Sequence, residues 1–416
     1  MIKNTPEKCF NFIPFRKHDI VEMCLKDNLL SDQETEFRHL SSMLSSIYHF
    51  EYHNIIESLK DSYALIDPDS DTRKPLATEL DKCDNFSVLL NTLLEKANYE
   101  RITEDELNQA LNESSLFKIR LHVDFDDFEE VLLFCRGESI REEKVPQWLG
   151  LSSKTITFIN YDRVVVYIRL SKDYQESKNS LPFSKPGATL LKLFQNVPKA
   201  DLEMLFPNTQ VRMRTIDKLL IGIPALISGS IVLTTKLGAA LILLGSLLGF
   251  WFGLSQQPVE LNKTTILVLL AGMTTLGGYL WKQFSNFKNR KLRFMQSLTQ
   301  NLYFKNLDNN AGVFHRLAND AEEEEGKEAL LAYYFLLISK PLLSKSELDR
   351  QIETWLLEKW HCAIDFEIDD AVTKLLNIGL IKKTDNTLVA ISIAEAIRVL
   401  DQRWDNYFTH DNKTFE

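Results

Sequence analysis

The sequence predicts four parts: a soluble α+β domain at residues 1–215, a two-pass helical membrane segment at 216–282, a helical connector at 283–343 and a mostly α C-terminal domain with winged-helix-like order at 344–416. Three observations predict them. A nearly uncharged stretch occupies the middle of the chain, helix-periodic and then strand-like segments precede it, and a helix–helix–hairpin–helix order follows it.

The uncharged stretch runs from residue 219 to 281 and contains only three charged residues, Lys236, Glu260 and Lys263. Because about 20 apolar residues suffice to cross a bilayer, this length allows two crossings. Basic residues flank it on both sides, at 212–218 and 282–293. The positive-inside rule therefore predicts two passes with both flanks in the cytoplasm. Whether the first apolar stretch crosses once or turns back near residue 236 stays open.

The first domain begins with helical patterns and continues with strands. Ser31 and Glu34 are spaced as in a capping box, and apolar residues then recur at helical spacing toward Tyr63. Further helices are expected over 86–99 and 103–112. Residues 116–134 and 155–170 are rich in β-branched and aromatic residues. The second of these segments predicts a hairpin that turns at residues 160–162.

After the membrane segment we expect a basic helix over 282–307 and a second helix over 321–338. The acidic run at 322–325 then lies in the first turn of that second helix, where it complements the helix dipole. Helices over 346–360, 369–377 and 393–407, with strands at 380–383 and 388–391, give the winged-helix-like order. Residues 341–416 contain nine Lys or Arg and fourteen Asp or Glu. This acidity favours protein partners over nucleic acid.

Two groups of residues have a spacing that is weak evidence for metal binding. His49 and His53 lie four residues apart on a predicted helix, and Asp67, Asp69 and Asp71 alternate as in a cation loop. Two histidines are too few for a zinc site. The aspartates lack the glycine and glutamate that complete an EF-hand loop. Surface histidines and a solvated turn are therefore the favoured interpretations.

A second set of candidates could support catalysis in the segment just before the membrane. Lys192, Lys199, Asp201 and Glu203 fall within residues 192–207, where Pro198 and Pro207 bracket a short helical turn. An ion-paired connector is favoured over a catalytic site. Cys135 and His122 lie in the strand-rich region without a third group to orient them, so we propose no nucleophile from them.

The five cysteines form no CxxC pair, which is typical of free thiols in a reducing compartment. The first residues lack the apolar core of a signal peptide and the pattern of a transit peptide. No Walker A, Rossmann, zincin or nucleophile-elbow motif occurs, so we expect no cofactor.

Three segments resemble a family of membrane proteins of unknown function that includes transmembrane protein 143. They are FIPFRKHDIVEMCL from Phe12, KLFQNVPKADLEMLFP from Lys192 and NLYFKNLDNNAGVFHRLANDAEEEEGKEALLAYYFLL from Asn301. The resemblance implies two helical passes between soluble flanks, and an association with mitochondria in animal relatives. It carries no catalytic residue.

The sequence therefore favours a non-enzymatic, membrane-anchored interaction or scaffold protein. Its expected partners are the lipid bilayer and a protein or second copy, bound through the membrane helices or the C-terminal domain. Glycines at 238, 245, 249 and 253 would allow close helix packing. A bacterial inner membrane is the favoured location and a mitochondrial membrane the alternative. The alternative function is a membrane-associated enzyme that uses the Lys192–Glu203 segment, with or without a metal.

Overall fold

The computed structural model describes residues 9–64, 66–68, 85–103, 105–107, 120–147, 152–173, 187–208, 210–212, 238–253, 262–340, 342–384 and 387–408. They fall into two compact units. Unit 1 takes its described residues from Met1–Glu113, Phe125–Leu202 and Lys305–Glu416, and unit 2 from Ser114–Asp124 and Glu203–Phe304. Segments from both ends of the chain thus build unit 1.

An antiparallel five-stranded sheet forms one layer of unit 1, in the order β2-β4-β5-β6-β8. One face carries alternating apolar side chains, including Phe134, Val165 and Leu193, which pack into a buried cluster with the helices. The predicted turn at 160–162 is wrong, because these residues lie inside β5 and pair with β4. The strand bounds are β2 (Glu100–Arg101), β4 (Phe128–Gln147), β5 (Ser152–Leu170), β6 (Thr189–Pro198) and β8 (Asn306–Asn309).

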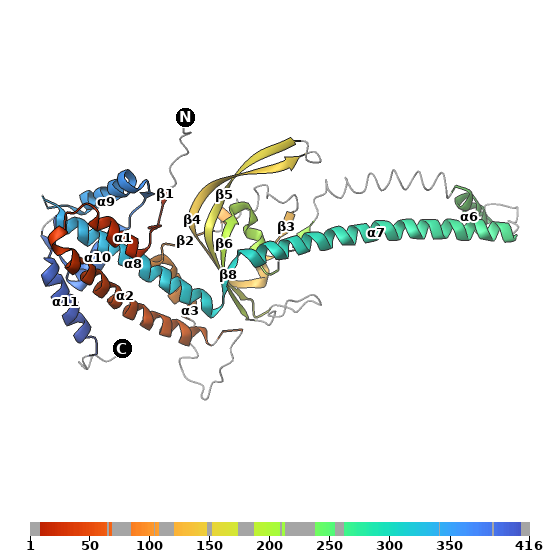
Figure 1. Ribbon diagram of the computed structural model, residues 1–416. Helices are drawn as coiled ribbons and strands as arrows, with labels where there is room; N and C mark the ends of the chain where they lie inside the picture. The colour runs from red at the N-terminus through yellow and green to blue at the C-terminus, as the bar shows by residue number, and fades with distance from the viewer. Residues whose placement is uncertain are drawn as a thin grey trace, which may run out of the picture. The chain divides into compact units, whose positions relative to one another are not determined.

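The helices α2 (Glu34–Tyr63), α3 (Phe86–Lys96) and α8 (Ala311–Ile338) pack together beside this sheet (Figure 1). The predicted end of α2 at Tyr63 is confirmed. Its predicted capping box is wrong, because Ser31–Gln33 form the 3-10 helix η1 and no side chain caps α2. Helix α8 begins ten residues earlier than predicted, so the acidic run lies in its interior and not in its first turn.

The C-terminal part of unit 1 has the predicted winged-helix-like order. It comprises α9 (Lys345–Trp360), α10 (Ile368–Ile378), the strands β10 (Ile381–Thr384) and β11 (Thr387–Ala390), and α11 (Ile393–Asp405). A capping box between Ser344 and Glu347 starts α9. Gly379 ends α10 at φ +87°, a left-handed conformation that suits glycine. These two signals explain why the boundaries here could be predicted closely.

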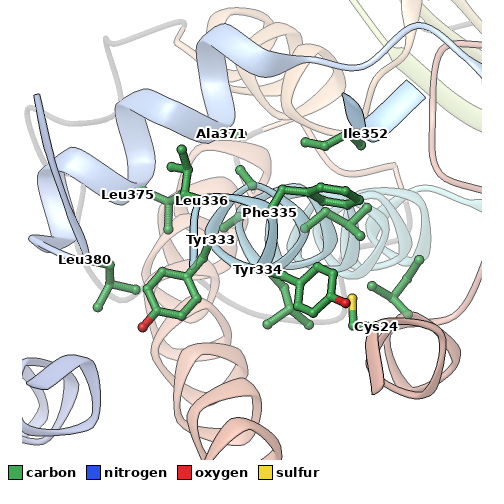
Figure 2. Close-up of a cluster of buried hydrophobic side chains, with 14 of the residues drawn as sticks. Cys24, Tyr333, Tyr334, Phe335, Leu336, Ile352, Ala371, Leu375 and Leu380 are labelled. Atoms are coloured by element: carbon green, nitrogen blue, oxygen red, sulfur yellow. The ribbon is translucent and has the colours of Figure 1, made fainter. Parts of the chain in front are cut away.

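The end of α8 forms the core of this part, and Figure 2 shows its consecutive residues from Tyr333 to Leu336 among apolar side chains from α1, α9 and α10. The Tyr333 hydroxyl donates to the Ile391 carbonyl at 2.9 Å, which satisfies a buried polar group. The amino-terminal segment joins the same core through α1 (Lys17–Leu25) and through β1 (Cys9–Phe10), which pairs in parallel with β9 (Ala363–Ile364). The C-terminal part is therefore packed into unit 1 along one continuous helix.

Unit 2 contains β3 (Arg120–His122) paired with β7 (Gln210–Arg212), the helix α6 (Gly238–Trp251) and most of α7 (Lys263–Lys305). Helix α6 has 14 residues, about 21 Å in length, which is shorter than the roughly 30 Å hydrocarbon core of a bilayer. Helix α7 has 43 residues, but it becomes polar and basic after Trp281.

Within the part of the chain that the structure describes, no helix combines the length and apolar character needed to cross a membrane. This finding contradicts the predicted two-pass segment at 216–282, although residues 213–237 and 254–261 of that region lie outside the described residues. The predicted membrane-anchored scaffold, its membrane-associated enzyme alternative and the bacterial or mitochondrial membrane location depend on that segment and are corrected with it. The low number of charged residues in this region indicated its apolar character, but it did not determine the lengths of the helices α6 and α7.

Candidate functional site

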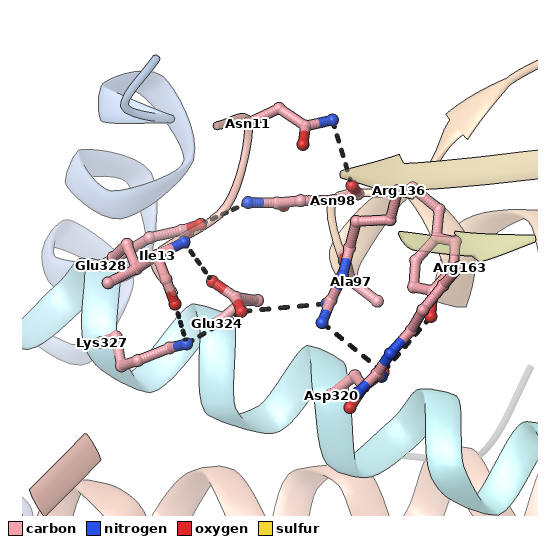
Figure 3. A network of polar contacts seen from close by, with 11 residues as sticks. Asn11, Ile13, Ala97, Asn98, Arg136, Arg163, Asp320, Glu324, Lys327 and Glu328 are labelled. Atoms are coloured by element: carbon pink, nitrogen blue, oxygen red, sulfur yellow. Dashed lines mark hydrogen bonds and ion pairs between the residues drawn. The ribbon is translucent and has the colours of Figure 1, made fainter. Parts of the chain in front are cut away.

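A run of charged residues lies in the buried middle of α8. Glu324, Glu325, Lys327 and Glu328 are each at most 4 % exposed. Burial of an unpaired charge is costly, so such a run persists only when each charge has a partner. The partners come from four separate segments of unit 1, as Figure 3 shows for part of the network.

The first partner is the backbone of the amino-terminal segment. Lys327 Nζ donates to the Ile13 carbonyl at 2.7 Å and to Glu324 Oε1 at 2.8 Å. Glu324 Oε2 accepts from the Ile13 N–H at 3.1 Å. The Glu324–Lys327 pair thus satisfies both polar groups of one backbone residue. It fixes the segment before α1 against α8.

Two arginines of the sheet hold the other end of the run. Arg163 of β5 forms an ion pair with Asp320, and Arg136 of β4 lies 3.8 Å from the same carboxylate. Arg136 also donates to the Ala97 carbonyl at 3.0 Å and lies over the Phe12 ring at 4.6 Å. The network therefore ties α8 to the sheet through planar guanidinium groups, which form several bonds at once.

The third partner is Lys374 of α10, which meets three carboxylates. Its Nζ is 3.3 Å from Glu325 and 3.4 Å from Glu328, and it also pairs with Asp370. Asn98 donates to Glu328 at 3.0 Å. Lys96 also lies 3.6 Å from Glu325, but two ammonium groups cannot neutralise three carboxylates, and burial raises the pKa of Glu328 to about 8. We therefore assign the retained proton to Glu328.

This proton makes stability depend on pH in a defined direction. An unfolded glutamate releases its proton near pH 4.3, whereas folded Glu328 keeps it to about pH 8, so the free energy of unfolding falls as pH rises between these values. Between pH 5 and pH 8, we expect the stability of Glu328→Gln relative to the unchanged protein to rise by about 3–4 kcal/mol. Urea unfolding at both pH values measures this.

The matched control is Glu57→Gln. The Glu57 pKa is lowered by its hydrogen bond from Lys60, so this group does not titrate between pH 5 and 8. Its substitution should shift the stability curve without changing the slope. Parallel curves for Glu328→Gln and the unchanged protein would contradict the assignment of the proton.

An open groove of about 750 Å³ lies beside this network. Helices from distant parts of the sequence line it: Lys17, His18 and Val21 of α1, Arg38, Ser41, Ser42, Ser45, Ser46, His49 and Phe50 of α2, Glu322 and Glu323 of α8, and Trp404 of α11. The groove adjoins the buried network, because Glu322 in its lining belongs to the same charged run of α8.

The floor of the groove is a chain of polar contacts. Glu322 Oε2 is 2.8 Å from His49 Nδ1, and Glu322 Oε1 is 3.6 Å from Lys17 Nζ. Lys17 donates to Ser45 Oγ at 2.6 Å. Ser45 and His49 share one helix face because they are four residues apart. With Nδ1 directed at Glu322, the Nε2 atom of His49 remains for a ligand, and the His49 side chain is 78 % exposed.

This arrangement can donate and accept hydrogen bonds. His49 beside Glu322 also has the geometry of an acid–base site, in which a carboxylate orients a histidine. The contact that Ser45 makes does not supply a base, because Lys17 is the donor in it. The floor is therefore suited to binding polar groups and does not contain an activated serine.

Aromatic side chains form one end of the groove. Phe50 contacts Trp404 edge-to-face at a ring distance of 5.9 Å, and it also meets Tyr407 at 4.2 Å and Phe408 at 5.3 Å. Trp404 is 45 % exposed and Phe408 is 74 % exposed. An ion pair of 2.9 Å between Arg403 and Glu51 holds α11 against α2 next to them. The rings are thus presented to solvent from a fixed position.

Of the residues predicted from histidine spacing, only His49 lies in this groove. His53 packs near the Phe50 ring, at 6.2 Å between centroids. Asp67 follows α2, and Asp69 and Asp71 lie outside the described residues. No three His, Cys, Asp or Glu side chains in the described ranges are close enough together to hold a metal ion. The structure therefore pairs His49 with a carboxylate 273 positions away and not with its predicted neighbour.

The other candidates lie elsewhere in the fold. Lys192 is half-buried on β6, and burial lowers its pKa. The 3-10 helix η5 (Lys199–Leu205) contains Lys199, Glu203 and the buried Asp201, which agrees with the predicted helical turn. Burial raises the pKa of the Cys135 thiol to about 12, so Cys135 is not a reactive thiolate.

Sequence reasoning missed Lys17, Ser45, Glu322 and Trp404. One signal was present: the four serines at 41, 42, 45 and 46 place hydroxyls on one face of a predicted helix. The partners of that face lie in segments that only folding brings together.

A family model described as a protein of unknown function (DUF3754) matches residues 161–312, from β5 to the first turn of α8. The groove residues lie outside this range. No solved structure matches the chain.

Proposed function

We propose that unit 1 is a recognition module that binds an extended segment of a partner protein in the groove between α1, α2 and α11. The observation that carries this proposal is the exposed Trp404 ring, in contact with the half-buried Phe50, at the end of a groove with a polar floor. Tryptophan and tyrosine dominate the binding energy of protein interfaces, where a large ring sits beside polar contacts.

The floor supports a peptide ligand because its groups match a peptide backbone. Lys17 and the serine hydroxyls can donate to carbonyl groups, and His49 Nε2 can accept from an N–H or donate to a carboxylate. An open groove admits a continuing chain, whereas an enclosed cavity suits a small molecule. The aromatic end would take an apolar side chain of the same segment.

The test selects peptides from a phage-displayed random library on the purified full-length protein. We expect enriched peptides to combine an aromatic or aliphatic residue with an acidic one. Trp404→Ala should weaken their binding at least about 10-fold, because truncating a central aromatic residue removes its buried contact area. Fluorescence anisotropy with a labelled selected peptide measures the affinity.

Trp281→Ala is the matched control, because Trp281 is 73 % exposed and lies in α7 of unit 2. It should leave peptide affinity unchanged. The proposal fails if no peptide is enriched, or if the selected peptides bind the Trp404→Ala and unchanged proteins equally well.

A further inference from the structure

The longest strand pair of the sheet extends beyond its neighbour. Strands β4 and β5 pair from Phe128↔Leu170 to Gln147↔Ser152, but β6 pairs with β5 only between Asn160 and Arg169. Residues 140–147 and 152–159 therefore form a two-stranded ribbon, which Figure 1 shows extending past the end of β6. We call this segment the ribbon.

The base of the ribbon is built to a fixed geometry. Gly137 has a φ of +76°, and a Cβ at this position would lie 2.6 Å from Asp162 Oδ2, so only glycine fits. Asn196 of β6 also has a left-handed backbone conformation, with a φ of +53°. Arg141 of β4 donates to Asn196 at 2.9 Å and lies 3.5 Å from Asp162. One side chain thus links three strands where the ribbon begins.

The two edges of the ribbon differ in charge. The β4 segment carries Arg-Glu-Glu-Lys at 141–144, whereas the β5 segment has one charged residue, Lys154, followed by the uncharged Thr-Ile-Thr-Phe-Ile at 155–159. Among the described residues, neither edge pairs with a further strand over these positions. Natural proteins protect an open strand edge with charged residues, because unpaired N–H and C=O groups recruit other strands. The β4 edge has this protection, whereas the β5 edge lacks it over residues 155–159.

An unprotected edge with high β propensity is a hazard unless it is covered in the working protein. A two-stranded ribbon is also only marginally stable by itself in water, and two further strands would stabilise it. These two features indicate that the β5 edge is paired.

We propose that the β5 edge of a second copy of this chain pairs with it antiparallel, across a two-fold axis. A closed dimer uses the same surface twice, so the surface must be complementary to itself. An uncharged edge at 155–159 satisfies this condition because no like charges oppose each other when it meets its copy. The result is a four-stranded sheet in which both β4 edges lie outside.

The test is sedimentation of the full chain by analytical ultracentrifugation. The unchanged protein should dimerise. Thr155→Lys/Thr157→Lys places four positive charges at the paired edges, and we expect it to raise the dissociation constant at least about 10-fold. Val88→Lys/Leu29→Lys is the control, because both residues are exposed in unit 1, Val88 on α3 and Leu29 in the turn after α1. It should leave dimerisation unchanged.

Hydrogen exchange of the unchanged protein provides a measurement that needs no variant. Amides of residues 152–159 should exchange more slowly as the protein concentration is raised, because mass action populates the dimer. A protein that is monomeric at about 100 µM would overturn the proposal. So would a dimer that the double lysine variant leaves intact, or exchange at 152–159 that does not depend on concentration.

Discussion

Lys327→Met is expected to lower the free energy of unfolding by about 3–5 kcal/mol, because it removes the only cation that is hydrogen-bonded to the buried Glu324 carboxylate among the described residues. Lys327 is 3 % exposed and donates to both Glu324 and the Ile13 carbonyl. After the substitution, Glu324 retains the Ile13 N–H and Arg136 at 3.8 Å, which is too long for a hydrogen bond. Urea unfolding followed by tryptophan fluorescence measures the loss.

Two controls separate an unpaired buried charge from a lost side chain. The double variant Glu324→Gln/Lys327→Met removes both charges and should recover most of the stability, since neutral replacement of a whole buried pair is often tolerated. Lys60→Met breaks a surface pair with Glu57 at 2.7 Å and should cost less than about 1 kcal/mol. Equal losses for Lys327→Met and Lys60→Met would show that the pair does not stabilise unit 1.

Phe314→Ala has a comparable expected effect in the other core of unit 1. The Phe314 side chain is fully buried and lies 5.6 Å from the Tyr63 ring and 6.2 Å from the Phe86 ring. It joins α8 to α2 and α3 above the sheet. Truncation creates a cavity among these elements, so we expect a loss of about 3–5 kcal/mol. Thermal unfolding monitored by circular dichroism is the measurement.

Phe284→Ala is the matched control, because it makes the same chemical change at a site that is 62 % exposed in α7. It should change stability by no more than about 0.5 kcal/mol. If both phenylalanine substitutions had the same small effect, Phe314 would not be part of a close-packed core.

The two cores also explain which elements could be predicted. The winged-helix-like order was predictable because Ser344 with Glu347, Gly379 and the short hairpin are local signals. The start of α8 was not, because β8 occupies Asn306–Asn309 only by pairing with β6, and this pairing places the start of the helix at Ala311. The predicted turn inside β5 failed for the same reason, since pairing with β4 keeps the strand extended.

The candidate site was predicted only in part. His49 was identified from its spacing to His53, but its actual partner is Glu322. The acidic run of α8 was explained by a helix terminus, whereas Glu322, Glu324 and Glu325 form ion pairs with Lys17, Lys327 and Lys374 of unit 1. No periodicity links these positions, because ion pairs between distant segments depend on packing and not on spacing along the chain.

The sequence by itself determined the elements of this protein: the long amphipathic helices, the β-branched strands and the capped helices of the C-terminal part. Each follows from residues within one or two turns of each other. Tertiary structure alone decided the helix lengths in residues 238–305, the partners of the buried charges, the groove and the ribbon. The physical reason is that burial and strand pairing join residues hundreds of positions apart, such as Ile13 and Lys327. The energy of such contacts appears only once the chain is folded.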